Sequence, residues 1–336
     1  MGRLEHYKRY GWTTSERNLE TLPEDAPQAA KDLAKYLIVE GRRRSLVEWL
    51  GHCKEDSKIH GKFWHIGSWT GRMAHSEPNQ ANIMSQFHGE PKTAIEEVKA
   101  RFDGPMRGLW RASPDKYLVG TDAEGIQLRI LTHYMKSPVW RDAICNGDKK
   151  LETDIHSMNR KALGPVCRDR DTAKTFIYAW VLGASIPKIA EILSTTVPKA
   201  KASNTQFLEA FPELKKLKTL KIPNDASKGY FTGLDGRKVI CNSEHLMLAG
   251  YLQSGESVVM KHATIKWHEE LNKRGIPFKL VDFVHDEWQT ECDSEEDAHE
   301  IGKVQCKAIE DVGNELGLYC PLAGSYDIGR TWLETH

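Results

Sequence analysis

The sequence has no long hydrophobic run, and it begins Met-Gly-Arg-Leu-Glu-His with no apolar segment behind these residues. A membrane-spanning helix needs about 20 consecutive apolar residues, and a secretory signal peptide needs an apolar core of its own. The sequence therefore predicts neither a membrane anchor nor secretion. It also lacks an excess of either charge, because Lys and Arg number 47 and Asp and Glu number 47. This balance excludes a basic coat of the histone type, but a neutral protein can still hold a polyanion in one positive groove.

Cysteine is scarce as well, and the seven cysteines are scattered, odd in number and free of any Cys-x-x-Cys pair. They are Cys53, Cys145, Cys167, Cys241, Cys292, Cys306 and Cys320. Such spacing fits neither a disulfide framework nor a zinc site, so a reducing cytoplasm is the expected location. Hydrophobic residues are 40% and charged residues 28% of the 336 positions, which is typical of a folded protein of about two domains.

Hydrophobic spacing predicts a mixed body of helices and strands, and no internal repeat is visible. The expected elements are a helix starting near Pro27, a strand over 116–121, a helix after Gly125, a helix over 170–183 behind the N-cap Asp169, a helix over 198–221, a helix over 254–272 that ends at Gly275, a strand over 278–284 and a helix from Ser294. The polar triplet His285-Asp286-Glu287 is predicted to form the tip of a hairpin.

Two acidic residues, Asp122 and Asp286, each follow directly on a predicted hydrophobic strand. An ionised carboxylate is costly to desolvate there unless a cation or hydrogen bonds meet it. Carboxylates suit Mg²⁺, which commonly bridges one or two of them to substrate phosphates. The two acids are therefore candidates for one metal site. The alternative is that each acid caps its own turn independently.

One predicted helix carries two cations, an aromatic ring and an aliphatic side chain at intervals of four residues. These are Arg170, Lys174, Tyr178 and Leu182. A triphosphate needs cations along its length, and a base needs a flat apolar surface, so this stripe could hold a nucleotide. The alternative is a solvated helix whose cations pair with Asp169 and Asp171.

Three segments together resemble the motifs of one enzyme family, in the family's order and at workable spacing. Residues 122–129 (Asp-Ala-Glu-Gly-Ile-Gln-Leu-Arg) resemble motif A of the A-family DNA polymerases, residues 170–178 with Gly183 resemble motif B, and Val284-His285-Asp286-Glu287 resembles motif C. Further matching segments are Thr70-Gly71-Arg72, Pro78-Asn79, Asp154-Ile155-His156, Leu234-Asp235-Gly236-Arg237 and Gln253-Ser254. The likeness is greatest to the replicative polymerases of short-tailed phages. It runs from Gly11-Trp12 to His336.

The resemblance implies an α+β fold of the right-hand polymerase type, with an antiparallel palm sheet, helical fingers and a partial helical thumb. The implied division is a partial thumb and its connection over 1–70, palm with motif A over 71–138, fingers with motif B over 139–232, and palm with motif C over 233–336.

The resemblance also implies roles for individual residues. Asp122, Asp286 and the backbone carbonyl of Ala123 would bind two Mg²⁺ ions, with Glu287 in support. The implied contacts to the incoming deoxynucleoside triphosphate come from Arg170, Lys174, Tyr178, His156 and Gln127, and those to the primer-template DNA come from Arg72, Gln253, His285 and Arg237.

Three residues depart from the family's pattern. Gln127 replaces a glutamate that blocks the ribose 2′-hydroxyl, which puts sugar discrimination in doubt. Leu182 replaces a tyrosine, and Ala249 replaces an asparagine. None of these changes affects the predicted metal ligands.

The likeness begins within the later part of the thumb and includes no proofreading exonuclease. We therefore expect the polymerase part of a split or truncated phage enzyme, acting in the host cytoplasm with a separate exonuclease-thumb polypeptide. Apolar residues of the thumb helix are expected to be partly uncovered without that partner. They are Ala30, Leu33, Leu37, Trp49 and Leu50.

Two other functions stay open. A single-subunit RNA polymerase shares the palm and is mildly favoured by Gln127, although Leu128-Arg129 and Thr132-His133-Tyr134 follow the DNA enzymes. A non-catalytic DNA-binding subunit derived from a polymerase is the other alternative. The joint presence of both motif aspartates and both motif B cations argues against it.

Overall fold

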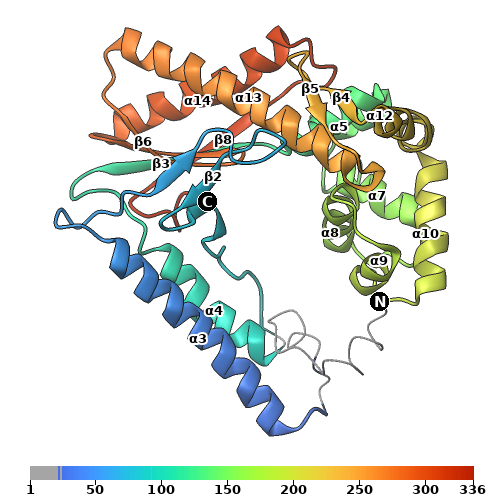
Figure 1. Ribbon diagram of the computed structural model, residues 1–336, viewed down its shortest axis with the longest axis horizontal. Coiled ribbons are helices and arrows are strands. Elements are labelled where there is room, and N and C mark those ends of the chain that lie inside the picture. The colour runs from blue at the N-terminus through green and yellow to red at the C-terminus, as the bar shows by residue number, and fades with distance from the viewer. Residues whose placement is uncertain (1–21, 23–24, 92) are drawn as a thin grey trace. The chain divides into compact units, whose positions relative to one another are not determined.

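The structure is a computed structural model that describes Leu22, residues 25–91 and residues 93–336 (Figure 1). The predicted likeness at Gly11 and Trp12 lies outside these residues. The helices and strands are α3 (Gln28–His52), β1 (Lys62–Trp64), β2 (Ala74–Ser76), η1 (Gln80–Asn82), α4 (Ala94–Arg107), β3 (Tyr117–Ala123), α5 (Ile126–Met135), α6 (Pro138–Cys145), α7 (Ile155–Leu163), α8 (Arg170–Val181), α9 (Ile186–Ile192), α10 (Val197–Ala210), α11 (Pro212–Lys216), η2 (Leu217–Lys221), α12 (Ile222–Lys228), β4 (Tyr230–Thr232), β5 (Lys238–Ile240), α13 (Glu244–Arg274), β6 (Lys279–Val284), β7 (Glu287–Cys292), α14 (Glu295–Glu315) and β8 (Gly324–Gly329).

The main sheet has four strands in the order β6-β7-β3-β8, and β1-β2 and β4-β5 form two small sheets. Strands β6 and β7 are antiparallel, with Val284 opposite Glu287. His285 and Asp286 therefore form the turn, which confirms the predicted hairpin. Because β7 is hydrogen-bonded to β3, the sheet order places this hairpin beside the strand that ends at Ala123.

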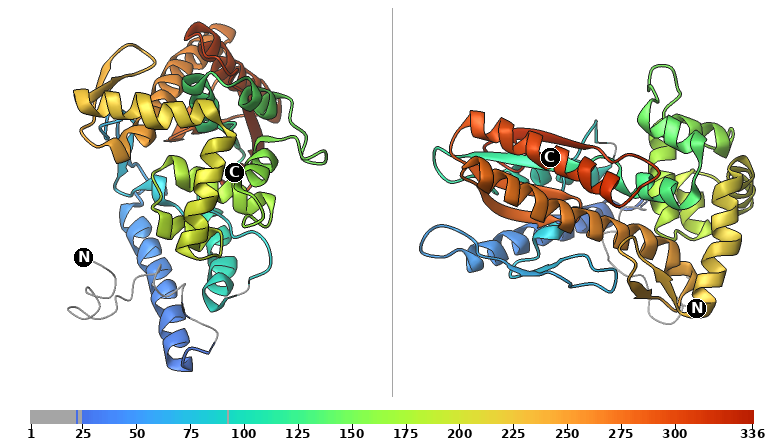
Figure 2. Two further views of the ribbon diagram at one scale, coloured as in Figure 1. Left: turned by 90° about the vertical axis from the view of Figure 1, so that its right-hand side faces the viewer. Right: turned by 90° about the horizontal axis from the view of Figure 1, so that it is seen from above.

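Helices α13 and α14 lie side by side, as the right-hand view of Figure 2 shows. Both are attached to the sheet through side-chain hydrogen bonds. The indole N–H of Trp288 donates to Thr264 Oγ1 on α13 at 3.0 Å. Gln305 on α14 donates to Thr290 Oγ1 at 2.9 Å and accepts from Thr121 Oγ1 at 2.6 Å. These bonds fix β3 one residue before Asp122.

The helices between β3 and β4 differ in one respect from the expected pattern. The prediction of one helix over 198–221 is wrong, because α10 ends at Ala210 and a new helix begins at Pro212. Proline disfavours a helical backbone in the residue before it, and Phe211 has φ −128° and ψ 83°. A π-helical turn, Leu217–Lys221, then precedes α12.

Helix α13 is longer than predicted. The expected start at residue 254 is wrong, because Ser243 caps the helix and its hydroxyl accepts from the backbone N–H of Leu246 at 3.4 Å. The expected end is confirmed, since Gly275 has φ 71° in the left-handed region that glycine adopts without strain. Because of the ten additional residues, Gln253 and Glu256 lie on one continuous helix.

The chain divides into two compact units, described separately here. The first comprises the described residues up to Phe63, His75–Leu118 and Ile328–His336, and the second comprises Trp64–Ala74 and Val119–Asp327. Every predicted site residue belongs to the second unit. The predicted α+β class is confirmed, whereas the finer division into thumb, palm and fingers stays a prediction.

In the first unit, α3 packs on α4 through a small apolar core. Its buried members are Ala34, Ile38, Ile95 and Val98. Arg42 and Asp103 pair across the two helices, with Nε to Oδ1 at 2.8 Å. The prediction that Trp49 is uncovered is wrong, because it is 8% exposed and meets the ring of Trp110 edge to face at 5.3 Å.

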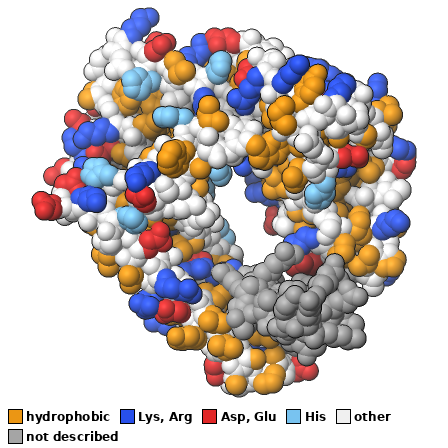
Figure 3. Space-filling model, viewed as in Figure 1, with side chains coloured by type: hydrophobic (Ala, Val, Ile, Leu, Met, Phe, Trp, Pro, Cys, Tyr) orange, Lys and Arg blue, Asp and Glu red, His pale blue; other side chains and the backbone are white. Residues whose placement is uncertain are grey.

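Charges of both signs are interspersed over the face drawn in Figure 3, as the net charge of zero predicts. Among the described residues, no helix is both long enough and apolar enough to cross a membrane.

Candidate functional site

The two motif aspartates lie at neighbouring strand ends of the main sheet. Asp122 is the second-last residue of β3, and Asp286 lies in the turn between β6 and β7. The backbone N–H of Ala123 donates to the backbone carbonyl of Asp286 at 3.0 Å. Both aspartates are half-buried. The structure therefore brings together the two acids that the sequence separates by more than 160 residues.

The surroundings of Asp286 oppose ionisation of its carboxyl group. Burial raises the pKa of Asp286 well above its ordinary value, and the negative charges of Glu256 and Asp122 raise it further. The positive charge of Arg72 opposes this effect but does not outweigh it. The site thus has an excess of carboxylate, which a bound cation would relieve.

These donors suit a hard divalent ion. Within the part of the chain that the structure describes, no group of three or more His, Cys, Asp and Glu side chains is arranged to hold a metal. Two aspartates with excess negative charge are nevertheless what Mg²⁺ uses when water and substrate phosphates complete its coordination. The oxygen-only set of Asp122, Asp286 and the Ala123 carbonyl therefore fits Mg²⁺.

Glu287, the predicted supporting acid, is buried at the first position of β7. Its Oε1 accepts from Gln289 Nε2 at 2.5 Å, two residues along the same strand. This bond fixes the carboxylate on the strand, and its role toward the metal pair stays a prediction.

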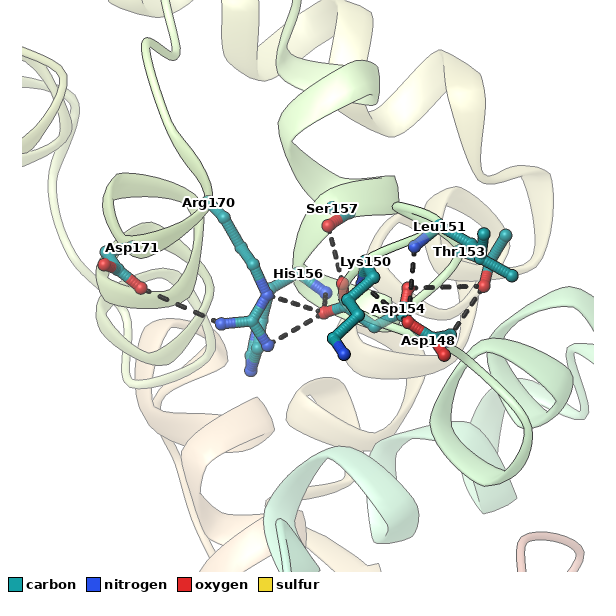
Figure 4. Close-up of polar contacts among 9 residues, drawn as sticks. All are labelled: Asp148, Lys150, Leu151, Thr153, Asp154, His156, Ser157, Arg170 and Asp171. Atoms are coloured by element: carbon teal, nitrogen blue, oxygen red, sulfur yellow. Dashed lines mark hydrogen bonds and ion pairs between the residues drawn. The ribbon is translucent and has the colours of Figure 1, made fainter.

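The motif B cation Arg170 is paired with Asp154, the N-cap residue of α7 (Figure 4). Arg170 Nε and Nη2 lie 3.0 and 2.9 Å from Asp154 Oδ1. Asp154 also accepts from the hydroxyl of Ser157 at 2.5 Å and from the backbone N–H of His156 at 3.0 Å. Burial alone would raise the pKa of Asp154, but these hydrogen bonds hold it well below its usual range.

The other predicted nucleotide contacts lie around the same helix. Lys174 is exposed one turn beyond Arg170. Burial raises the pKa of Tyr178, and so do the charges of Asp286 and Asp122, so Tyr178 lies within electrostatic reach of both aspartates. The rings of Tyr178 and His156 are 6.1 Å apart. Burial lowers the pKa of His156 to about 4, with Arg170 contributing, so this imidazole is neutral at pH 7.

Three of the four predicted DNA contacts meet at the segment 70–72, which is bound to α13. Gln253 Oε1 accepts from Thr70 Oγ1 at 3.4 Å. Arg237 Nη2 donates to the carbonyl of Thr70 at 3.0 Å and to Ser254 Oγ at 3.1 Å. Arg72 forms an ion pair with the same helix, described below.

Gly71 allows this close approach. Its φ of 92° lies in the region that side chains rarely adopt, and a Cβ there would lie 2.7 Å from Arg237 Nη2. Ser257 Oγ donates to the Gly71 carbonyl at 2.6 Å. The segment is therefore held rigidly against α13.

The fourth predicted DNA contact, His285, lies in the β6–β7 turn with φ 58°, an uncommon conformation for a residue other than glycine. Burial lowers its pKa to about 4, and the positive charge of Arg72 contributes. His285 is therefore neutral at pH 7 and lies within electrostatic reach of Arg72.

One residue of the site was missed by sequence reasoning. Glu256 on α13 is fully buried, and its Oε2 lies 2.5 Å from Arg72 Nη2 and 3.1 Å from Gln127 Nε2. The available signal was that Glu256 is the only charged residue in the stretch 246–260. A lone acid inside an otherwise uncharged helix needs a partner, because an unpaired buried carboxylate is costly.

Comparisons with known proteins show the family of the chain. The model of the family "DNA polymerase family A" matches residues 2–334. The DNA-directed DNA polymerase of Enterobacteria phage T3 is 33% identical over 95% of this chain, and that of Escherichia phage T7 is 32% identical over 95%. The chain belongs to DNA polymerase family A. It spans about half the length of these two relatives, 48% of each.

A solved structure shows the same fold. It is described as "POL domain of Pol1 from M. smegmatis complex with DNA primer-template and dNTP", and it matches 97% of this chain with a TM-score of 0.80 at 20% identity. The match covers 57% of that chain. This likeness confirms the predicted α+β polymerase fold.

The three residues that are predicted to depart from the family's pattern lie in different surroundings. Gln127 is half-buried against Glu256. Leu182 is 46% exposed at the end of α8, whereas Ala249 is 7% exposed within α13. Of the three, only Gln127 is bonded to another residue of the site.

Proposed function

We propose that this chain is a template-directed DNA polymerase module that adds deoxynucleotides to a primer 3′ end by a two-metal-ion mechanism. The observation that carries the proposal is that Asp122 and Asp286 lie at neighbouring strand ends, where burial and the neighbouring carboxylates raise the pKa of Asp286. Family membership supports it, because the T3 and T7 relatives are DNA-directed DNA polymerases. We place this activity in the host cytoplasm.

Asp122, Asp286 and the Ala123 carbonyl would hold two Mg²⁺ ions. When bound, these ions activate the primer 3′-hydroxyl and stabilise the leaving pyrophosphate. The chain itself contributes positioning, because the hydrogen bond between Ala123 and Asp286 fixes the spacing between the end of β3 and the β6–β7 turn, which carry the proposed ligands.

Arg170, Lys174 and the neutral His156 would bind the triphosphate, and Tyr178 would lie beside its sugar and base. Arg170 already has a partner in Asp154, so a phosphate must share or replace that carboxylate. The pairing keeps the guanidinium oriented before the nucleotide arrives, which reduces the ordering that binding requires.

Arg72, Gln253, His285 and Arg237 would contact the primer-template near the growing end. Their attachment to α13 or to the hairpin turn supports this assignment, since groups that check base-pair geometry must be held in place. Gln253 and Arg237 offer donors suited to minor-groove acceptors, which vary little with sequence.

The test is single-nucleotide extension of a labelled primer on a defined template, with Mg²⁺, each deoxynucleotide in turn and then each ribonucleotide. Incorporation of only the complementary deoxynucleotide supports the proposal. Efficient incorporation of ribonucleotides alone would favour the RNA polymerase alternative, which rests on Gln127. DNA binding without any incorporation would leave a non-catalytic subunit.

We further propose that the chain acts together with a separate exonuclease-thumb polypeptide and synthesises long products only with it. One observation supports this partner: α3 carries exposed apolar side chains. Among these are Leu33 and Leu50, 44% and 74% exposed, as the sequence predicted.

The chain alone should make fewer phosphate contacts than the chain with the exonuclease-thumb polypeptide. Its dissociation from DNA should therefore be fast and strongly dependent on salt. The test compares product length from the chain alone and with a separately produced exonuclease-thumb polypeptide. Long products from the chain alone at moderate salt, unchanged by the addition, would contradict this part of the proposal.

A further inference from the structure

Glu256 links three segments that are far apart in the sequence. It lies on α13 with no exposed surface, and both of its printed partners reach the same oxygen, Oε2. These partners are Arg72 at 2.5 Å and Gln127 at 3.1 Å. The other oxygen, Oε1, has no hydrogen-bond partner among the described residues. A cation and an amide therefore share the same carboxylate oxygen of Glu256.

The carboxylate determines how the Gln127 amide is turned. An ionised carboxylate only accepts hydrogen bonds, so the NH₂ group of Gln127 must face Glu256 and its carbonyl oxygen must face away. Without an acceptor at position 256, the amide could rotate or swing away. Glu256 thus fixes both the position and the orientation of Gln127.

The same contact explains why position 127 carries an amide. A carboxylate at 127 would meet the Glu256 carboxylate at about 3 Å, and like charges so close cannot both stay ionised. The acid that family A polymerases usually carry at this point is replaced here by an amide bonded to an acid on a different helix. The two residues are therefore complementary.

We propose that Glu256 is a positioning residue for sugar selection, holding the Gln127 amide where it limits the 2′ substituent of the incoming nucleotide. The inference rests on the proposed function, because it takes Gln127 to lie beside the nucleotide sugar. Glu256 acts through Gln127 and not on the reacting atoms.

The first test measures the ratio of incorporation efficiencies, kcat/KM, for a deoxynucleotide and its ribonucleotide on the same primer-template. This ratio cancels changes in DNA affinity or in the active fraction of enzyme. Glu256→Met removes the acceptor at similar length and should lower the ratio about tenfold or more. Ser257→Ala is the matched control, since it removes the neighbouring bond to Gly71 and leaves the Gln127 contact in place. Its ratio should stay within about twofold of the original.

The second test asks whether Glu256 acts through Gln127. Gln127→Ala should lower the ratio by about as much as Glu256→Met, and the double variant should be no worse than either single one. An equal further loss when Glu256→Met is added to Gln127→Ala would overturn the inference, because Glu256 would then act through Arg72 or through the fold.

A charge exchange keeps the test valid even if Glu256→Met folds poorly. Gln127→Glu alone places two carboxylates in contact and should lower deoxynucleotide incorporation about tenfold. Adding Glu256→Gln restores one acid and one amide, and should return incorporation and the ratio to within about threefold of the original. An exchange variant no better than Gln127→Glu would contradict the complementary pairing.

Failure of the inference can be told apart from failure of the proposed function. If the unmodified chain incorporates deoxynucleotides but every variant keeps its ratio, only the positioning role is wrong. If the unmodified chain incorporates no deoxynucleotide with Mg²⁺, the proposed function fails and the inference fails with it.

Discussion

At the β6–β7 turn, Asp286 lies beside two other carboxylates, whereas at the start of α7 Asp154 lies beside the guanidinium of Arg170. Burial opposes ionisation of both aspartates. The pKa of Asp286 is nevertheless raised and that of Asp154 is lowered, because only Asp154 receives enough hydrogen bonds and positive charge to offset its burial.

The two ends of the site therefore differ in the charge that their ligands must supply. The Asp122–Asp286 end has an excess of negative charge, which the proposed divalent cations would offset. The Asp154–Arg170 end is already neutralised, so the proposed triphosphate would have to compete with a carboxylate of the chain. Metal binding at the Asp122–Asp286 end should therefore relieve repulsion between carboxylates. Nucleotide binding at the Asp154–Arg170 end should exchange one ion pair for another.

The largest effect is expected at the metal end. Asp122→Asn and Asp286→Asn should each lower single-nucleotide incorporation by more than about a hundredfold, because each removes a charged ligand of the two ions. Single-turnover extension with saturating primer-template measures this loss. The control is Asp327→Asn, at an exposed position of β8. Incorporation within about tenfold of the original in either ligand variant would contradict the metal assignment.

A smaller effect separates the two cations of α8. Arg170→Ala and Lys174→Ala should each weaken use of the nucleotide by about 10- to 100-fold without weakening binding of primer-template. Only Arg170→Ala should also lower the free energy of unfolding, because it leaves Asp154 without its cation. Rates against nucleotide concentration and urea unfolding give the two readouts. Lost duplex affinity with unchanged nucleotide dependence would move these residues to a DNA-binding surface.

The stabilisation of the fold by the Asp154 carboxylate should depend on pH. Its folded pKa is lowered, so its stabilisation is present above the unfolded value of about 3.9 and is lost as the pH falls through the folded pKa. Asp154→Asn should lower the free energy of unfolding by about 1–3 kcal/mol at neutral pH. The difference in free energy of unfolding between the unmodified chain and Asp154→Asn should become smaller below about pH 4. A difference that stays constant from pH 7 to acidic pH would show that the charge of Asp154 contributes nothing to stability.

The smallest effect concerns His156. Because burial lowers its pKa to about 4, the imidazole is neutral at pH 7 and contributes a hydrogen bond and not a positive charge. His156→Gln should therefore lower nucleotide use by only a few-fold, on the order of one neutral hydrogen bond. The nucleotide dependence between pH 6 and 8 should be the same in both proteins. A His156-dependent step near pH 6.5 would contradict a neutral histidine.

Local signals in the sequence predicted much of the fold. Asp169 and Ser294 cap α8 and α14 as expected, since their carboxylate and hydroxyl oxygens accept from backbone N–H groups at the helix starts. The hairpin tip at His285 and Asp286 was also predicted correctly. The break at Pro212 was missed because the charged helical pattern continues across it.

Site residues could be predicted from the sequence only where they belong to motifs that follow one another in a fixed order. Asp122, Asp286, Arg170 and Lys174 belong to motifs with a fixed order, so a single sequence could propose them together. Glu256 could not be found in this way, because its partners Gln127 and Arg72 lie 129 and 184 residues away and meet it only in the folded chain.

Thermal unfolding of the unmodified chain and of Asp286→Asn, first without divalent ions and then across a Mg²⁺ titration, tests the proposed metal site most directly. Without metal, Asp286→Asn should be more stable than the unmodified chain, because a raised pKa means that burial and the neighbouring carboxylates oppose ionisation of Asp286 in the folded state. Added Mg²⁺ should stabilise the unmodified chain and leave the variant nearly unchanged. An Asp286→Asn protein that is less stable than the unmodified chain without metal, and that gains equally from Mg²⁺, would contradict a carboxylate site completed by metal ions.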